Sequence, residues 1–154
     1  MSVAFRRESD EEHKEPKFEI PIAPGANLVT PRGLALIEAK LAELDTAIAA
    51  ATEDEAREAL RREHRYWGTR RSTALIAPTP APGEVGIGSR VTFRLNGKTR
   101  AISIVGGDEA DPASDLIAFT APLARAMMGA EAGEQIDYNG VDEAIEVIAV
   151  EDAA

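Results

Sequence analysis

The first regular feature of the chain is a helical spacing of apolar residues that starts after Val29. Five of them recur at intervals of 3, 4, 3 and 4 residues, namely Leu34, Ile37, Leu41, Leu44 and Ile48. This period places all five on one helix face. Thr30 stands before Pro31, which is typical of an N-cap followed by the first helical position. The pattern predicts a helix that begins after Thr30 and carries one narrow apolar seam.

A second helix is predicted to begin after Thr52, because Thr52 and Glu55 have the spacing of a capping box. Only a few residues separate the two helices, so residues 28–77 are predicted to fold as an antiparallel helical hairpin with arms about 30 Å long. The seam of the second helix is poorer than that of the first. We therefore expect Trp67 and Leu75 to pack against the next domain at the base of the hairpin.

From residue 88 onward the apolar period falls to two, which is typical of strands. Asn96-Gly97 lies between two alternating runs and predicts the turn of a β-hairpin. Further elements are predicted as strands at Leu116–Phe119, Glu134–Tyr138 and Glu143–Val150 and as a short helix at Pro122–Met128. The fold class is therefore α+β, in which a Pro/Gly linker at 78–87 joins the helical hairpin to a small antiparallel β domain at 88–151.

The first 27 residues mix charges with prolines and show one brief alternation, at 18–22. Residues 1–27 are predicted to be an extended or disordered arm, with a short strand at 18–22.

Composition excludes several kinds of site. The 154 residues include no Cys, and the two histidines, His13 and His64, are too far apart in sequence to suggest a zinc pair. No apolar run approaches the roughly 20 residues of a membrane helix, and the N-terminus lacks the apolar core of a secretory signal. We expect a cytoplasmic protein with no membrane contact and no metal of its own.

Charge is spread unevenly along the chain. Of its 17 basic and 27 acidic residues, the segment 84–154 holds 5 and 13. An acidic surface of this kind repels nucleic-acid backbones and attracts basic patches on proteins. Direct nucleic-acid binding by this half is therefore not expected.

An acidic loop follows the strand that ends near residue 105. It contains Asp108, Glu109, Asp111 and Asp115, and three explanations are open: a metal site, a solvated turn, or a surface for a protein partner. The stretch DEADPASD lacks the ligand spacing and central glycine of an EF-hand loop, which disfavours the metal site. A solvated turn needs only local hydrogen bonds from the carboxylates to backbone N–H groups.

Three stretches carry a resemblance to a known family: VTFRLNGKTRAISIVGGDEAD, LIAFTAPLARAMMGAEAGEQID and AIEVIAV. Together they resemble the C-terminal domain of the Gre (GreA/GreB) transcription elongation factors, and LVTPRGLALIEAKLAEL resembles the start of that family's coiled coil. The resemblance implies an FKBP-like β domain that seats on bacterial RNA polymerase at the rim of its secondary channel. It also implies a monomer that meets nucleic acid only within the transcription complex.

The same resemblance assigns candidate binding residues. Those that fall where the family contacts the polymerase are Asp108, Glu109, Asp111, Pro122 and Arg125. Two positions depart from the family's usual pattern: Ala121 replaces a Ser, and Ala130 replaces a Lys.

The resemblance to the Gre factors also concerns the chemistry at the hairpin tip. Gre factors bring tip carboxylates in an Asp-x-x-Glu-Asn pattern to a magnesium ion of the polymerase, which stimulates transcript cleavage by the polymerase itself. Here Glu53, Asp54 and Glu55 are the only candidates, and acids in a first helical turn also serve the helix dipole. Because the hairpin is about twenty residues shorter than usual, its reach is roughly 15 Å less. We expect a polymerase-binding regulator that is not an enzyme, has no intrinsic cofactor and at most contacts the polymerase Mg²⁺ indirectly.

Further alternatives remain. Arg57, Arg61 and Arg65 form a basic stripe that would either meet RNA or channel walls, or pair with neighbouring acids on the helix. The chain is also similar to Rnk, a short Gre-like protein named as a regulator of nucleoside diphosphate kinase. A prolyl isomerase is disfavoured, because fold alone does not carry function and few aromatic residues are present to wall a prolyl pocket.

Overall fold

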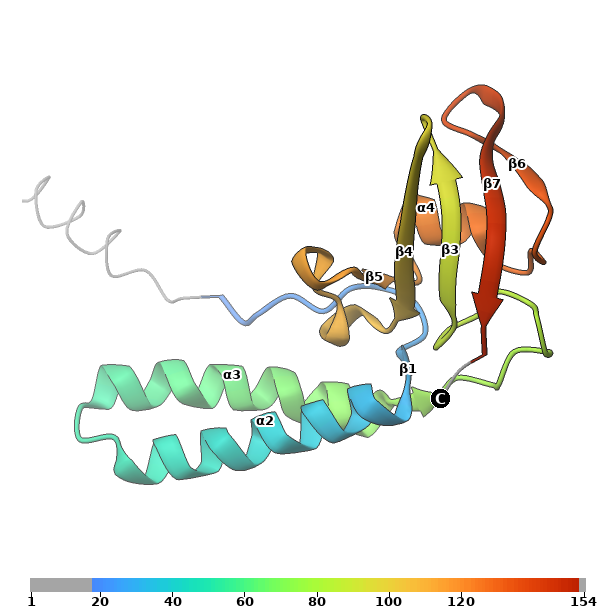
Figure 1. Ribbon diagram of the computed structural model, residues 1–154. Helices are drawn as coiled ribbons and strands as arrows, with labels where there is room; N and C mark the ends of the chain where they lie inside the picture. The colour runs from blue at the N-terminus through green and yellow to red at the C-terminus, as the bar shows by residue number, and fades with distance from the viewer. Residues whose placement is uncertain (1–17, 153–154) are drawn as a thin grey trace, which may run out of the picture.

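The computed structural model describes residues 18–152. A helical hairpin projects from one end of a compact β domain, and the chain enters and leaves the hairpin at that same end (Figure 1). This arrangement confirms the predicted α+β class. Within the described residues, no helix is both long and apolar enough to cross a membrane.

The hairpin consists of α2 (Pro31–Ala50) and α3 (Asp54–Thr73). Thr30 is the N-cap of α2, as predicted, and its hydroxyl accepts a hydrogen bond from the Gly33 amide at 2.9 Å. Along the predicted seam, Ile37 and Leu44 are buried, while the other three apolar residues are half-buried. The hairpin therefore rests on a thin apolar contact, as its sequence pattern indicates.

The start of α3 differs from the prediction. Its N-cap is Glu53 rather than Thr52, and no side chain caps the first turn. The expected capping box is therefore wrong. Asp54 and Glu55 nevertheless stand in the first turn, where the helix dipole favours negative charge.

A two-stranded parallel sheet, which was not predicted, closes the base of the hairpin. It pairs β1 (Leu28–Val29) with β2 (Leu75–Ile76). Leu75 is 58% exposed, so the expectation that it packs at the base is wrong. Trp67 is half-buried and makes an edge-to-face contact with Tyr66, with ring centroids 5.2 Å apart.

The β domain is built on one five-stranded sheet with the order β5-β4-β3-β7-β6. Its strands are β3 (Arg90–Leu95), β4 (Lys98–Val105), β5 (Leu116–Ala118), β6 (Gln135–Tyr138) and β7 (Val141–Glu151). The central strand β3 runs antiparallel to β4 and β7, and β6 is antiparallel to β7.

One pair makes the sheet mixed rather than wholly antiparallel. β5 runs parallel to β4, with Ser103 opposite Leu116. Between them the chain forms two 3₁₀ turns, η1 (Gly107–Glu109) and η2 (Pro112–Ser114). These turns carry the chain back alongside the end of β4, so β5 starts in the same direction. The predicted antiparallel domain is corrected in this respect.

The core lies between the sheet and the short helix α4 (Pro122–Met127), which Figure 1 shows crossing behind the strands. Its fully buried large side chains include Phe93, Ile102, Ile104, Met127 and Ile145. Val85 and Ile87 belong to the same cluster. Val85 also exchanges backbone hydrogen bonds with Gly129 and Ala130. The end of the stretch predicted as a linker, 78–87, is therefore part of the β domain.

The described part of the N-terminal arm contains no strand before β1. The predicted strand at 18–22 is therefore not formed, and Phe18 is 92% exposed. Pro21 lacks the amide hydrogen that a strand ladder needs, and the segment is instead held to α3 by Glu19, which accepts hydrogen bonds from Arg65. Residues 1–17 of the predicted arm lie outside the described residues.

Candidate functional site

Asp108, the first residue of the acidic loop, faces α3 rather than solvent. Its carboxylate accepts hydrogen bonds from the Tyr66 hydroxyl and from Arg70 Nε, each at 2.5 Å. The side chains of Arg70 and Asp108 are only 9% and 10% exposed. Tyr66 and Arg70 are four residues apart, so one face of α3 presents both donors to the same carboxylate.

Arg70 extends this contact to the segment that leads into β1. Its Nη2 donates to Asn27 Oδ1 at 2.8 Å, and Asn27 Nδ2 donates to the Arg70 carbonyl at 2.7 Å. Both residues are buried. Every member of a buried polar network has to be hydrogen-bonded, because an unsatisfied group there is costly. Asn27, Arg70 and Asp108 meet this condition together.

Glu109, the next residue, reaches the other helix. Its carboxylate accepts from the Thr30 hydroxyl at 2.5 Å and from Arg32 Nη1 at 2.7 Å. The Glu109 side chain is 3% exposed, whereas that of Arg32 is 67% exposed. Because Thr30 is the N-cap of α2, this carboxylate lies at the positive end of the helix dipole.

Two glycines allow this close approach. A Cβ at Gly33 would stand 2.9 Å from Glu109 Oε1, and a Cβ at Gly106 would stand 2.6 Å from the Leu28 carbonyl oxygen. Real Cβ atoms essentially never come this close, so the Glu109 carboxylate would have to shift at Gly33 and the backbone would have to shift at Gly106. Glycine at 33 and 106 therefore lets α2 and β1 pack directly against the acidic loop.

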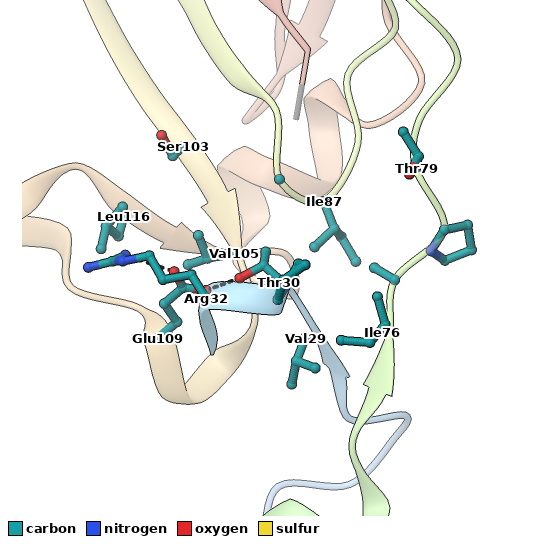
Figure 2. A pocket seen from close by; sticks show the side chains of 14 residues that line it. Val29, Thr30, Arg32, Ile76, Thr79, Ile87, Ser103, Val105, Glu109 and Leu116 are labelled. Atoms are coloured by element: carbon teal, nitrogen blue, oxygen red, sulfur yellow. Dashed lines mark hydrogen bonds and ion pairs between the residues drawn. The ribbon is translucent and has the colours of Figure 1, made fainter. Parts of the chain in front are cut away.

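A cavity of about 420 Å³ lies beside this junction, between the hairpin base and the ends of β4 and β5. Figure 2 shows Arg32, Glu109 and Thr30 along one side and Ile76 and Ile87 along the other. Residues of both the hairpin base and the β domain line this cavity. The two parts are therefore in side-chain contact as well as joined by the chain.

The pKa of Tyr66 reports this environment. Burial and the hydrogen bond to Asp108 raise it from the ordinary value of 10.0 to about 12. The phenol therefore keeps its proton, and its role as a donor, well above neutral pH.

The other residues predicted to bind the polymerase lie elsewhere on the surface. Asp111, Pro122 and Arg125 are all exposed. Asp111 accepts a hydrogen bond from the Ser114 hydroxyl at 2.9 Å, and Pro122 is the first residue of α4. The acidic loop thus separates into two inward carboxylates and the exposed side chains of Asp111 and Asp115. Assignment of Asp108 and Glu109 to a partner surface stays a prediction, and it competes with their contacts inside the chain.

At the hairpin tip, Glu53, Asp54 and Glu55 are exposed. Asp54 makes a 3.4 Å ion pair with Arg57, and Arg57 Nη2 also donates to the Ala51 carbonyl at the end of α2. In the described part of the chain, no three acidic or histidine side chains are grouped so that they could hold a metal ion.

The three arginines of the predicted basic stripe have different surroundings. Arg57 belongs to the tip contacts, and Arg61 is exposed. Arg65 pairs with Glu58 on its own helix and with Glu19 of the N-terminal segment. The hydrogen bond between Arg65 and Glu19 lowers the pKa of Glu19 and raises the pKa of Arg65. The stripe is therefore partly engaged by neighbouring acids.

Residues 79–152 match the family described as "Transcription elongation factor, GreA/GreB, C-term". The domain formed by residues 79–152 therefore belongs to the GreA/GreB C-terminal family. Among curated relatives, the chain is 43% identical over 65 residues to the transcription elongation factor GreA of Mycoplasma capricolum, covering 41% of each chain. It is 42% identical over 62 residues to GreA of Mesoplasma florum, covering 39% of this chain and 40% of that one. The chain thus spans about two fifths of the length of the curated relatives it matches.

Solved structures of the family also resemble the chain. GreA factor homolog 1 (Gfh1) of Thermus thermophilus is 17% identical, with 82% of this chain and 99% of that one covered and a TM-score of 0.38. For the GreA/GreB factor of Nitrosomonas europaea the identity is 14%, the coverage 82% and 98%, and the TM-score 0.39.

Sequence reasoning missed the partners of the two inward carboxylates. These partners are Thr30, Arg32, Tyr66 and Arg70, and Asn27 joins the network through Arg70. One signal was available: Tyr66 and Arg70 put polar groups at helical spacing beside the base of the hairpin, where an apolar seam was expected. A polar pair at such a place needs buried partners, and the acidic loop supplies them.

Proposed function

We propose that this chain binds bacterial RNA polymerase through its C-terminal domain, extends the hairpin into the secondary channel and regulates elongation without efficient transcript cleavage. The observation that carries the proposal is the family match over residues 79–152. The relatives' printed names, which describe transcription elongation factors, support the same partner. The proposed docking surface includes Asp111, Pro122 and Arg125, which are all exposed.

Two features of the hairpin support weak or absent cleavage. Each helix has 20 residues, which corresponds to a length of about 30 Å. Among the described residues, no three acidic side chains at the tip are grouped so that they could hold a metal ion, and Asp54 is paired with Arg57. Activation of water by a metal ion requires carboxylates that hold the ion in a fixed geometry. The tip of this hairpin lacks such an arrangement.

A second function, stimulation of transcript cleavage through the tip, is favoured by one observation: Glu53, Asp54 and Glu55 are solvent-exposed at the far end of the hairpin. In a polymerase channel, such side chains would be free to reorient toward a metal ion. This function and the one proposed above require the same docking and differ only at the tip.

The test combines binding with cleavage. Core polymerase is titrated with the chain in competition with an authentic GreA factor, and the RNA in stalled, backtracked complexes is followed over time. We expect competition without RNA shortening. If Asp111→Ala, Pro122→Ala and Arg125→Ala together weaken competition by about tenfold or more, each contributing a few tenths to one kcal/mol, docking runs through this surface.

Asp142→Ala is the matched control, because Asp142 is an exposed acid at the start of β7, outside the acidic loop and α4. It should leave competition unchanged. Failure of the wild-type chain to compete at low salt would overturn the proposed partner. RNA shortening that disappears in Glu53→Ala/Asp54→Ala/Glu55→Ala would instead establish the second function.

A further inference from the structure

The two carboxylates at 108 and 109 divide their contacts between the two helices. Asp108 binds α3 through Tyr66 and Arg70, and Glu109 binds the start of α2 through Thr30 and Arg32. Both carboxylates come from one 3₁₀ turn, η1. One short turn of the β domain therefore holds each helix of the hairpin by a separate charged contact.

These contacts are suited to fixing a direction. Charge-assisted hydrogen bonds are short and directional, and they strengthen where water is excluded. The Asp108 and Glu109 side chains are nearly buried, and the parallel pairing of β1 with β2 fixes the two chain crossings beside them. Rotation of the hairpin about its base would break one or both contacts and expose their charges.

A small rotation at the base of the hairpin produces a large displacement of its tip. With arms about 30 Å long, a rotation of only about 10° at the base displaces the tip by about 5 Å. The thin seam between α2 and α3 keeps the two helices together, but it does not orient the pair against the β domain. That orientation depends on the contacts made at η1.

We propose that Asp108 and Glu109 are positioning residues that aim the hairpin relative to the docking domain. This role rests on the proposed function for its biological meaning, since an aimed hairpin matters only if the β domain seats on a polymerase. The orientation itself is a property of the free protein and can be measured without the polymerase. Neutralising Asp108 and Glu109 would leave the exposed docking surface intact. The position of the hairpin tip relative to the β domain would then vary.

The first arm of the test measures the free, full-length chain. Because the sequence contains no Cys, spin labels can be attached at Thr52→Cys on the tip and Lys98→Cys on the β domain, both of which are exposed positions. Pulsed electron paramagnetic resonance should give one narrow distribution of the distance between the two labels in the otherwise wild-type chain. In Asp108→Asn/Glu109→Gln, the distribution should widen by about 5 Å or more. An unchanged width would overturn the proposal.

Two further variants keep this arm interpretable. Asp115→Asn removes an exposed carboxylate of the same loop whose nearest cation is Arg100 at 4.0 Å, and it should leave the width unchanged. Tyr66→Phe removes only the phenol hydrogen bond to Asp108. It should widen the distribution less than the double variant does, and it serves as the decisive variant if the double variant does not fold.

The second arm separates positioning from direct contact with the polymerase. For Asp108→Asn/Glu109→Gln, the competition constant should stay within about threefold of wild type, while the effect on elongation at saturating protein falls by about fivefold or more. A fall in competition of tenfold or more would show that the two carboxylates contact the polymerase, and it would overturn positioning as their role. If the wild-type chain itself does not bind, the proposed function fails, and the distance measurement still decides the positioning role in the free protein.

Discussion

The base and the tip of the hairpin both carry acidic side chains close to arginines, yet they differ in what surrounds them. At the base, Asp108 and Arg70 are 2.5 Å apart and nearly buried. At the tip, Asp54 and Arg57 are 3.4 Å apart, and the Asp54 side chain is fully exposed. Because exposed ion pairs contribute little and buried ones cannot be broken cheaply, similar residue pairs have different structural importance. The comparison shows that burial, rather than residue type, separates structural carboxylates from available ones.

The largest effect is expected when the base loses one partner of its buried pair. Arg70→Ala leaves Asp108 buried without its cation and removes a hydrogen-bond partner of Asn27. The free energy of unfolding should fall by about 3–5 kcal/mol. Urea denaturation followed by circular dichroism measures this change. A loss below about 1 kcal/mol would show that water reaches the pair and that the base resembles the tip.

Two glycine substitutions sharpen the comparison. Gly33→Ala places a Cβ 2.9 Å from Glu109 Oε1, so despite the better helix propensity of Ala it should lower the free energy of unfolding by about 1–2 kcal/mol. Gly68→Ala lies within α3 and meets nothing within 4 Å. It should raise the free energy of unfolding by about 0.5–1 kcal/mol. Equal effects of the two substitutions in thermal or urea unfolding would contradict the close contact at the base.

Tyr66 gives the base a spectroscopic signature. Its pKa is raised from 10.0 to about 12, so the folded protein binds the phenol proton more tightly than the unfolded chain does. The stabilisation is fully present below pH 10.0 and is lost as the pH rises through about 12. Absorbance of tyrosinate should show one of the two tyrosines ionising late. Tyr66→Phe should remove this late phase, and its persistence would assign the phase to Tyr138.

The smallest effects are expected at the tip. Asp54→Ala removes an exposed partner of Arg57, and the free energy of unfolding should change by less than about 0.5 kcal/mol. Urea unfolding at low and high salt measures it, with Asp108→Asn as the matched change at the base. A larger loss for Asp54→Ala than for Asp108→Asn would reverse the comparison.

Local patterns predicted most of the fold because their causes are local. Thr30-Pro31 fixed the start of α2, and Asn96-Gly97 located the turn between β3 and β4. The pairing of β1 with β2 could not be predicted in the same way, since each strand has only two residues and its partner lies 47 positions away in sequence. Strands this short carry no periodic signal.

The candidate site shows the same difference between local patterns and contacts made by residues distant in sequence. Exposed Asp111, Pro122 and Arg125 were proposed from family resemblance, and their binding role stays a prediction. The surroundings of Asp108 and Glu109 depend on donors between 38 and 79 residues away in sequence. Acidic residues at four nearby loop positions look equivalent until the fold places two of them beside helices. The close approach at Gly33 and Gly106 likewise became visible only in the folded chain.

The most direct test of a clamped base and a free tip is a pair of double-mutant cycles measured by urea unfolding. One cycle combines Asp108→Ala with Arg70→Ala, and the other combines Asp54→Ala with Arg57→Ala. The account predicts a coupling energy of about 1.5–3 kcal/mol for the base pair and at most about 0.5 kcal/mol for the tip pair. Equal coupling energies in the two cycles would contradict it.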